Sequence, residues 1–267
     1  MKRLILICTT FLMMFVSSVS AAQKITLADV TGSKFAPKVV SGINPIEGTD
    51  TYARISDDGK RIVTYSFKTG REQSVLFDVN NTMGEKISSF DGYTMSPDGT
   101  RLLIQTKTNY IYRRTYTAVN EIYTIASRKL ERLSDGGPQQ VPTWSSDGQQ
   151  VAFVREGNIF LVKLLYDNAE IQVTKDGKFN EVINGIPDWV NEEEFGFNRA
   201  LTFNADGTML CWIRYDESKV KTYSLQMYKG MRPEHSEYTD YPGFYSYKYP
   251  KAGQDNSVVT AWSYDIK

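Results

Sequence analysis

The stretch Ser145-Ser146-Asp147-Gly148, followed by the apolar run Val151-Ala152-Phe153, decides the fold because it recurs along the chain. Glycine adopts a positive φ at no steric cost, so Asp-Gly ahead of an apolar run predicts a tight turn that leads into a β-strand. The other copies of this turn are Ser56-Asp57-Asp58-Gly59, Ser96-Pro97-Asp98-Gly99 and Asn204-Ala205-Asp206-Gly207. An aliphatic residue stands three positions after each glycine, at Ile62, Leu102, Val151 and Leu210.

Further apolar runs complete a repeating unit around each turn. A second run follows each of these strands, at residues 75–77, 122–124, 159–162 and 223–225. A third run follows three of them, at residues 86–87, 130–133 and 171–173. Four strands per unit are typical of a propeller blade, whose period is about 40–45 residues. We therefore expect an all-β fold, a partial β-propeller of about four to five blades of four-stranded antiparallel sheets. An antiparallel sandwich with Asp-Gly hairpins is the alternative.

The spacing of the turns locates an insertion. Successive turn glycines lie 40, 49 and 59 residues apart, and the surplus in the last interval falls between Val173 and Leu201. An insertion in a repeat usually projects as a loop, often on the binding face. This one carries Glu192-Glu193-Glu194 among the apolar residues Trp189, Val190, Phe195 and Phe197.

The three consecutive glutamates have an ordinary and a functional interpretation. A charge run is most often a solvated loop or helix end. The many flanking apolar residues favour instead a site whose acids are held in place by packing. Two carboxylates would suit an ammonium group, whose three donors can satisfy both acids. Adjacent residues of a strand point to opposite faces, so the acids can converge only on a turn or a short inserted helix.

A pair of arginines among aromatic residues forms a second candidate, Tyr112-Arg113-Arg114-Thr115-Tyr116. Arginines on a strand surface are the ordinary interpretation. The functional one is a guanidinium that binds a carbonyl or carboxylate group.

Composition excludes several classes of function. Lys and Arg total 31, as do Asp and Glu, and such a balance argues against a nucleic-acid-binding surface. With one histidine and two cysteines, a Cys/His zinc site is improbable. No Gly-x-Ser-x-Gly elbow, Gly-rich phosphate loop or EF-hand pattern occurs, so we expect no catalytic residue of that kind, no metal and no cofactor. Cys211 is expected to be a buried structural thiol.

Residues 1–22 are typical of a secretory signal peptide. Met1-Lys2-Arg3 is a positive start, residues 4–16 are apolar and residues 17–22 are small. The apolar run is too short to span a bilayer comfortably. We therefore expect export to the periplasm or outside the cell, no membrane span after cleavage, and one propeller domain at residues 23–267.

Four motifs make the chain resemble the N-terminal β-propeller of dipeptidyl peptidase IV, in the prolyl oligopeptidase group of serine peptidases. In the family's order, they are residues 112–118, 185–195, 213–218 and 249–253. The second, Gly-Ile-Pro-Asp-Trp-Val-Asn-Glu-Glu-Glu-Phe, is the specific one. The likeness runs over most of the chain after the leader. Asn191 stands where the family usually has tyrosine.

The resemblance implies a function for the candidate residues. The family removes dipeptides from peptide N-termini and prefers proline or alanine second. By resemblance, Glu193 and Glu194 hold the free α-ammonium of the substrate. Arg113 binds the carbonyl oxygen of its second residue or organises the glutamates.

The resemblance also implies that a part of the enzyme is missing here. The family's serine, aspartate and histidine lie in a C-terminal α/β-hydrolase domain, and this sequence stops at Lys267. We expect an incomplete propeller without catalytic residues, inactive alone, whose partners are a peptide N-terminus and the missing hydrolase domain. The alternative is a stand-alone periplasmic propeller that binds a protein or peptide and has no peptidase activity.

Overall fold

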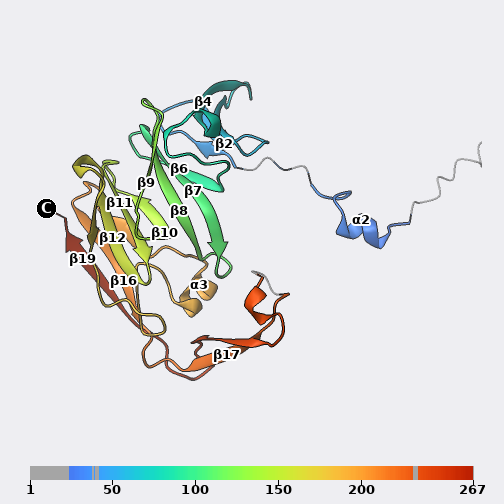
Figure 1. Cartoon of the computed structure of the whole chain (residues 1–267), viewed down its shortest axis with the longest axis vertical. Helices are drawn as coiled ribbons and strands as arrows, with labels where there is room; N and C mark the ends of the chain where they lie inside the picture. Colours follow the sequence, from blue (N-terminus) through green and yellow to red (C-terminus); the bar gives the residue numbers. More distant parts are fainter. Residues whose placement is uncertain (1–23, 38, 40–41, 231–233, 267) are drawn as a thin grey trace, which may run out of the picture. The chain divides into compact units, whose positions relative to one another are not determined.

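The computed structural model describes residues 24–37, 39, 42–230 and 234–266, in two compact units, Met1–Ser41 and Gly42–Lys267 (Figure 1). The first unit contains the short helix α2 (Leu27–Thr31). The Thr26 hydroxyl accepts from the Asp29 N–H and the Asp29 carboxylate accepts from the Thr26 N–H, a capping box that starts the helix. The predicted signal peptide, residues 1–22, lies outside the described residues.

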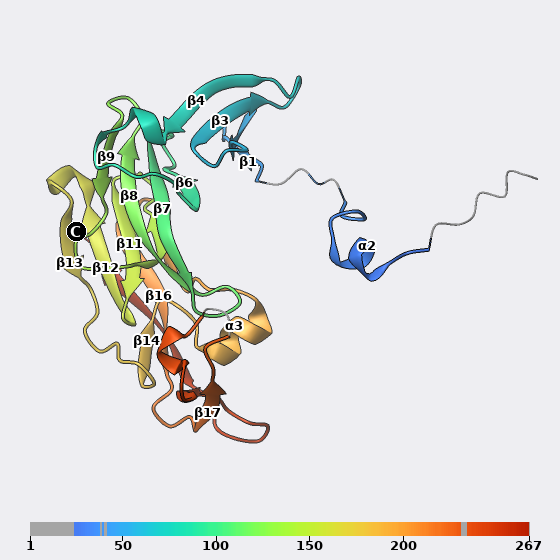
Figure 2. The same ribbon diagram turned by 45° about the vertical axis from the view of Figure 1, so that its right-hand side comes forward.

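The described strands of Gly42–Lys267 form successive sheets in chain order (Figures 1 and 2). The first sheet contains β1 (Asn44–Pro45), β2 (Thr51–Ile55), β3 (Arg61–Ser66) and β4 (Glu72–Asp78). The second has the order β5-β9-β8-β7-β6, from β5 (Met83–Gly84), β6 (Gly92–Met95), β7 (Arg101–Tyr110), β8 (Tyr116–Thr124) and β9 (Lys129–Arg132). The third contains β10 (Gln140–Trp144), β11 (Gln150–Arg155), β12 (Asn158–Lys163) and β13 (Ala169–Gln172).

The fourth sheet has a divided edge. The strands β14 (Val182–Asn184) and β15 (Leu201–Phe203) pair with successive parts of β16 (Met209–Asp216), and β19 (Val258–Asp265) pairs along its other edge. The helix α3 (Trp189–Phe195) lies between β14 and β15 in the chain. The strands β17 (Thr222–Met227) and β18 (Gly243–Lys248) form a separate hairpin. Three 3₁₀ turns complete the described elements, at Val79–Asn81, Leu164–Tyr166 and Ser236–Tyr238.

All four Asp-Gly turns occur where the sequence predicts them, each between two antiparallel strands of one sheet. Gly59, Gly99, Gly148 and Gly207 have φ of 68°, 69°, 68° and 70°, which is why glycine is favoured there. Neighbouring turns also touch. The Ser146 hydroxyl donates to the Asn204 carbonyl at 2.8 Å, and the Gln150 amide donates to the Gly207 carbonyl at 3.3 Å. The repeated turns therefore link one sheet to the next.

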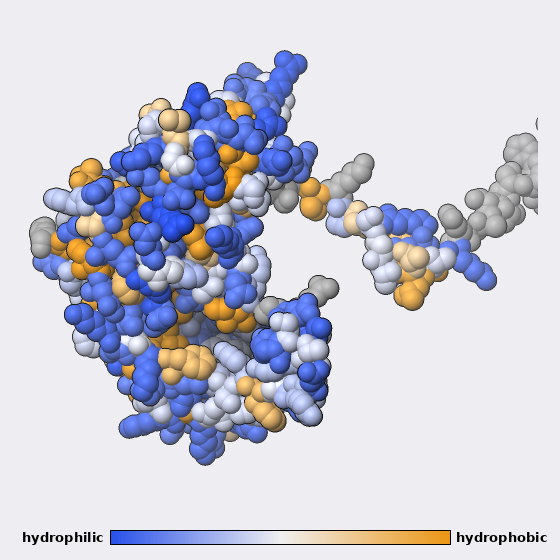
Figure 3. Space-filling model, viewed as in Figure 1, coloured by the Kyte–Doolittle hydropathy of each residue, from blue (hydrophilic) through white to orange (hydrophobic). Residues whose placement is uncertain are grey.

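The core lies between consecutive sheets, and this confirms the propeller arrangement over the sandwich. On β11, Ala152 and Val154 pack with residues of the fourth sheet, whereas Val151 and Phe153 pack with residues of the second. A further cluster joins the first sheet to the second. A sandwich buries one face of each sheet, but the third sheet buries both. Apolar residues also reach the surface as separate patches among hydrophilic ones (Figure 3).

Three expectations about individual residues are wrong. Residues 223–225 lie in β17 of the hairpin, and the strand that pairs with β16 as its blade neighbour is β19. Residues 86–87 are not in a strand; the short β5 pairs in parallel with β9 just before them. Cys211 is half-buried, because it alternates with the buried Leu210 and Trp212 and points to the opposite face of the sheet.

Among the described residues, no helix is long and apolar enough to cross a membrane.

Candidate functional site

The acidic segment is an insertion that leaves the fourth sheet and returns to it at the same point. The Ala200 N–H donates to the Gly185 carbonyl at 2.8 Å, so residues 186–199 leave and rejoin the sheet at one point. Gly185 has a φ of 78°, and a Cβ there would lie 2.9 Å from the Leu201 side chain and 3.0 Å from that of Val154. The base of the insertion therefore requires glycine, for both its conformation and its close packing.

The helix α3 carries the glutamates and has defined ends. The Asp188 carboxylate caps its N-terminus by accepting from the Asn191 N–H at 2.9 Å, and also from the Asn191 side-chain amide at 2.7 Å. Gly196, with a φ of 71°, ends it and donates its N–H to the Glu192 carbonyl. The acids thus lie on a short helix, one of the two arrangements expected. Asn191, in place of the family's tyrosine, adds a bond to the cap.

The first of the three glutamates is a structural link. Glu192 is only 3% exposed. Its carboxylate accepts from the Arg114 N–H at 2.8 Å, from the Thr115 N–H at 2.9 Å and from the Thr115 hydroxyl. These donors belong to the loop between β7 and β8, so Glu192 fastens α3 to the arginine segment. The sequence could not reveal this role, because residues 192–194 are all glutamate and nothing in the pattern sets Glu192 apart from the other two.

The second glutamate faces the arginine segment at the surface. Glu193 accepts from the Tyr112 hydroxyl at 3.0 Å, and its carboxylate lies 3.3 Å from the Arg113 guanidinium. The Glu193 side chain is 24% exposed and that of Arg113 is 66% exposed. The structure therefore brings together Arg113 and Glu193, which come from two separate motifs of the sequence. Tyr112 is an additional site residue, for which the sequence motif by itself indicates no role.

The third glutamate is exposed. No hydrogen bond or ion pair joins the Glu194 carboxylate to any residue that the structure describes. Consecutive helical residues point about 100° apart. One turn of helix therefore directs Glu192 inward, Glu193 toward Arg113 and Glu194 toward solvent. The arrangement leaves a free carboxylate beside one held by a phenol and a guanidinium.

Aromatic rings brace the helix between the arginine segment and the hairpin. The Trp189 ring lies 6.1 Å from that of Tyr112 and 4.4 Å from that of Tyr249, between centroids. Tyr247 of β18 lies 6.1 Å from Trp189 on the hairpin side. Figure 2 shows α3 close to the end of β7 and to the hairpin. Aromatic pairs at such distances stabilise by about 0.5–1.5 kcal/mol each beyond their burial.

A buried acidic residue lies beneath the helix cap. The Ser257 hydroxyl donates to the Asp188 carboxylate. The cap residue therefore also binds the end of residues 217–257, the segment that contains the hairpin. Glu217 begins that segment and is 6% exposed. Burial, with the negative charge of Asp188 adding to it and Lys248 opposing, raises the pKa of Glu217 to about 7. Burial likewise raises the pKa of Tyr215 to about 12.

The raised pKa of Glu217 predicts a stability that falls with increasing pH. The folded pKa of about 7 lies above the usual glutamate value of about 4.5, so between these values the native state binds more protons than the unfolded state. The free energy of unfolding should therefore decrease as pH rises from about 4.5 through 7, by about 1–3 kcal/mol for this group. Urea unfolding at pH 5 and pH 8 measures the change, and Glu217→Gln should reduce it. An unaltered pH dependence in that variant would contradict the assignment.

The fold and the site together define a class: a β-propeller region with an acidic helix inserted in one blade and held against an arginine segment. The model of the dipeptidyl peptidase IV (DPP IV) N-terminal region matches residues 96–267. The chain belongs to this family, as the resemblance indicated.

Comparison with individual proteins agrees. The crystal structure of Porphyromonas gingivalis dipeptidyl peptidase 4 matches with a TM-score of 0.84 and 34% identity, over 91% of this chain and 34% of that one. A probable dipeptidyl-aminopeptidase B of Podospora anserina is 32% identical over 91% of this chain and 29% of its own length. The prolyl endopeptidase FAP of Bos taurus is 28% identical over 93% of this chain and 31% of its own. The chain thus spans about three tenths of the length of these relatives.

Proposed function

We propose that this chain is the substrate-anchoring part of a serine exopeptidase that releases N-terminal dipeptides, and that Glu193 and Glu194 bind the α-ammonium of the peptide. The observation that carries the proposal is the pair of adjacent carboxylates on α3, one exposed and one held by Tyr112 and Arg113. An ammonium group has three donors and can bond to both. An N-acylated terminus has no charge and keeps one N–H donor in place of three, so the site selects free N-termini.

Arg113 has two compatible roles in this proposal. Its guanidinium lies 3.3 Å from the Glu193 carboxylate, close enough to orient it. Because the Arg113 side chain is 66% exposed, it retains donors for a carbonyl oxygen of the peptide. Holding the terminus at Glu193 and Glu194 while Arg113 contacts the second residue would fix how far the peptide reaches toward a nucleophile.

The remaining parts of the proposal concern the complete protein. We place the catalytic serine, aspartate and histidine in an α/β-hydrolase domain outside this sequence, and expect this chain alone to lack peptidase activity. The exposed apolar residues Val258 and Trp262, which share one face of β19, are a surface that the rest of the protein would cover. The pattern of residues 1–22 supports export to the periplasm or beyond.

Peptide binding tests the proposal directly. A tetrapeptide that begins Ala-Pro should bind the 267-residue chain at least about tenfold more tightly than its N-acetylated form, because a charge-assisted bond contributes about 1.5–3 kcal/mol. Isothermal titration calorimetry at pH 7.5 measures both affinities. Equal affinities for the free and acetylated peptides would refute the anchoring role. Release of Ala-Pro by the chain alone would refute the assignment of catalysis to the missing part.

A further inference from the structure

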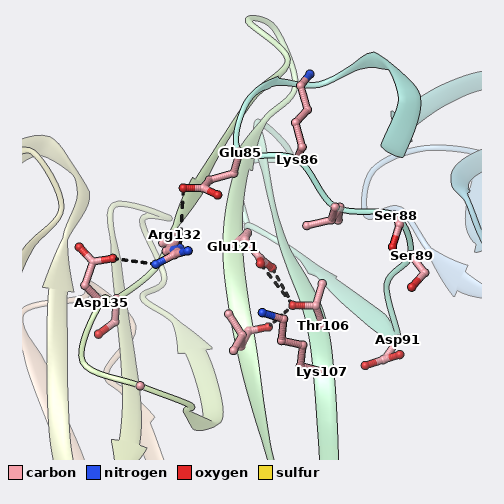
Figure 4. A pocket seen from close by; sticks show the side chains of 14 residues that line it. Glu85, Lys86, Ser88, Ser89, Asp91, Thr106, Lys107, Glu121, Arg132 and Asp135 are labelled. Atoms are coloured by element: carbon pink, nitrogen blue, oxygen red, sulfur yellow. Dashed lines mark hydrogen bonds and ion pairs between the residues drawn. The ribbon is translucent and has the colours of Figure 1, made fainter.

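A second polar site lies away from the α3 helix, in a cavity of about 400 Å³ beside the second sheet. Its walls come from the segment between β5 and β6, from β7 and β8, and from the end of β9 with the loop that follows it (Figure 4). None of the lining residues belongs to α3 or to the arginine segment. The candidate site for peptide N-termini therefore does not account for this cavity.

A buried carboxylate faces this cavity. Glu121 of β8 is 6% exposed, and the hydroxyl of Thr106 on β7 lies 3.2 Å and 3.3 Å from its two oxygens. A hydroxyl carries one hydrogen, whereas an ionised carboxylate offers about four acceptor positions. Glu121 thus retains acceptor capacity in a location with little access to water. Burial raises the pKa of Glu121 to about 7, the Thr106 bond opposing this, and the group ionises near neutral pH.

The arginine that lines the cavity is paired with other acids. The Arg132 guanidinium lies 3.7 Å from the Glu85 carboxylate and 3.6 Å from that of Asp135, as the dashed lines of Figure 4 show. No ion pair joins Arg132, or Lys107 on β7, to Glu121 among the described residues, although both act on its pKa at longer range. The charged groups that line the cavity are Glu85, Lys86, Asp91, Lys107, Glu121, Arg132 and Asp135.

The chemistry of the lining selects the kind of ligand. Four acids against three bases disfavour an anion, and the one charged lining residue that is buried, Glu121, is an acid. Among the described residues no group of three or more His, Cys, Asp or Glu side chains could hold a metal ion. A planar guanidinium can donate two parallel hydrogen bonds to one carboxylate. The apolar walls from Ile87 and Val119 would contact the carbon atoms of such a ligand.

We propose that this cavity is a binding site for a small organic cation with a guanidinium group, held by the Glu121 carboxylate. The ligand donates to the acceptor positions of the Glu121 oxygens that the Thr106 hydroxyl leaves free. Arg132, paired with Glu85 and Asp135, lines the same cavity as a competing positive charge. This proposal is independent of the one for α3, because the two sites share no residue.

Calorimetric titration of the 267-residue chain with methylguanidinium at pH 8 tests the site. Methylguanidinium should bind at least about tenfold more tightly than its neutral isostere methylurea, and Glu121→Gln should abolish that difference. Glu72→Gln, an exposed acid of β4, is the matched control and should change nothing. Binding should also weaken as pH falls from 8 to 6, because Glu121 becomes protonated. Methylammonium should bind more weakly than methylguanidinium, since it lacks the planar pair of donors.

A second variant tests the site without altering the buried group. Arg132→Gln removes the competing charge from a side chain that is 56% exposed, so it should leave the fold intact and strengthen methylguanidinium binding severalfold. Equal binding of methylurea and methylguanidinium, or full binding by Glu121→Gln, would overturn the proposal. Unchanged or weaker binding by Arg132→Gln would overturn the role given to Arg132.

Discussion

Replacing both Glu193 and Glu194 by glutamine should reduce the affinity for a peptide with a free N-terminus by at least about 100-fold, because two charge-assisted bonds of about 1.5–3 kcal/mol each are lost. Glutamine preserves the length and shape of the side chains, so α3 should keep its structure. Calorimetry with the Ala-Pro tetrapeptide measures the loss. In the complete protein, the same change should reduce kcat/KM by a similar factor.

The controls separate charge from fold. Glu72→Gln removes an exposed negative charge from the first sheet and should leave peptide affinity within about twofold of the original. The acetylated peptide should bind the double variant and the original chain equally, since it never uses the two carboxylates. An affinity for the free peptide that survives the double substitution would remove α3 from the site.

The single variants should differ in a way that the contacts predict. Glu193→Gln also weakens the links to Tyr112 and Arg113, whereas no described residue bonds to the Glu194 carboxylate. Glu193→Gln should therefore alter the position of Arg113 as well as the charge. A nuclear magnetic resonance spectrum of the chain should show the Arg113 resonances shifting in Glu193→Gln and staying in place in Glu194→Gln.

Replacing Glu192 by alanine should lower the free energy of unfolding by about 3–5 kcal/mol, since a buried charged acceptor is lost and two backbone N–H groups are left without it. Glu194→Ala, at an exposed position of the same helix, should change stability by less than about 0.5 kcal/mol. Urea unfolding measures both. A Glu192→Ala chain as stable as Glu194→Ala would contradict the structural role of Glu192.

Hydrogen exchange gives this prediction a local readout. The amides of Arg114 and Thr115 donate to the Glu192 carboxylate, so they should exchange much faster in Glu192→Ala. Amides in the middle of β11 lie in a different sheet and should respond only to the change in global stability. Unaltered protection at Arg114 and Thr115 would mean that other bonds hold the loop to the helix.

Local chemistry made much of the fold predictable. The Asp-Gly turns follow from the tolerance of glycine for positive φ, and all four were found as expected. The continuous apolar run at β11 follows from burial of both sheet faces. The hairpin at β17 and β18 could not be assigned in this way, because residues 223–225 are as strand-like as a blade strand. The place beside β16 is taken by β19, which lies more than thirty residues further along the chain, so residues 223–225 pair with β18 instead.

The sequence by itself determined that this is a repeated all-β chain with an acidic insertion and an arginine segment that together resemble a peptidase propeller. Turn chemistry and apolar periodicity are local, so they can be read from neighbouring residues. Only the tertiary structure decided that Glu192 is buried and joins α3 to the arginine segment, that Glu193 faces Arg113 and that Glu194 is exposed. The physical reason is that one turn of helix points identical side chains in different directions, and the partners of Glu192 and Glu193 come from a loop 77 to 81 residues earlier in the chain.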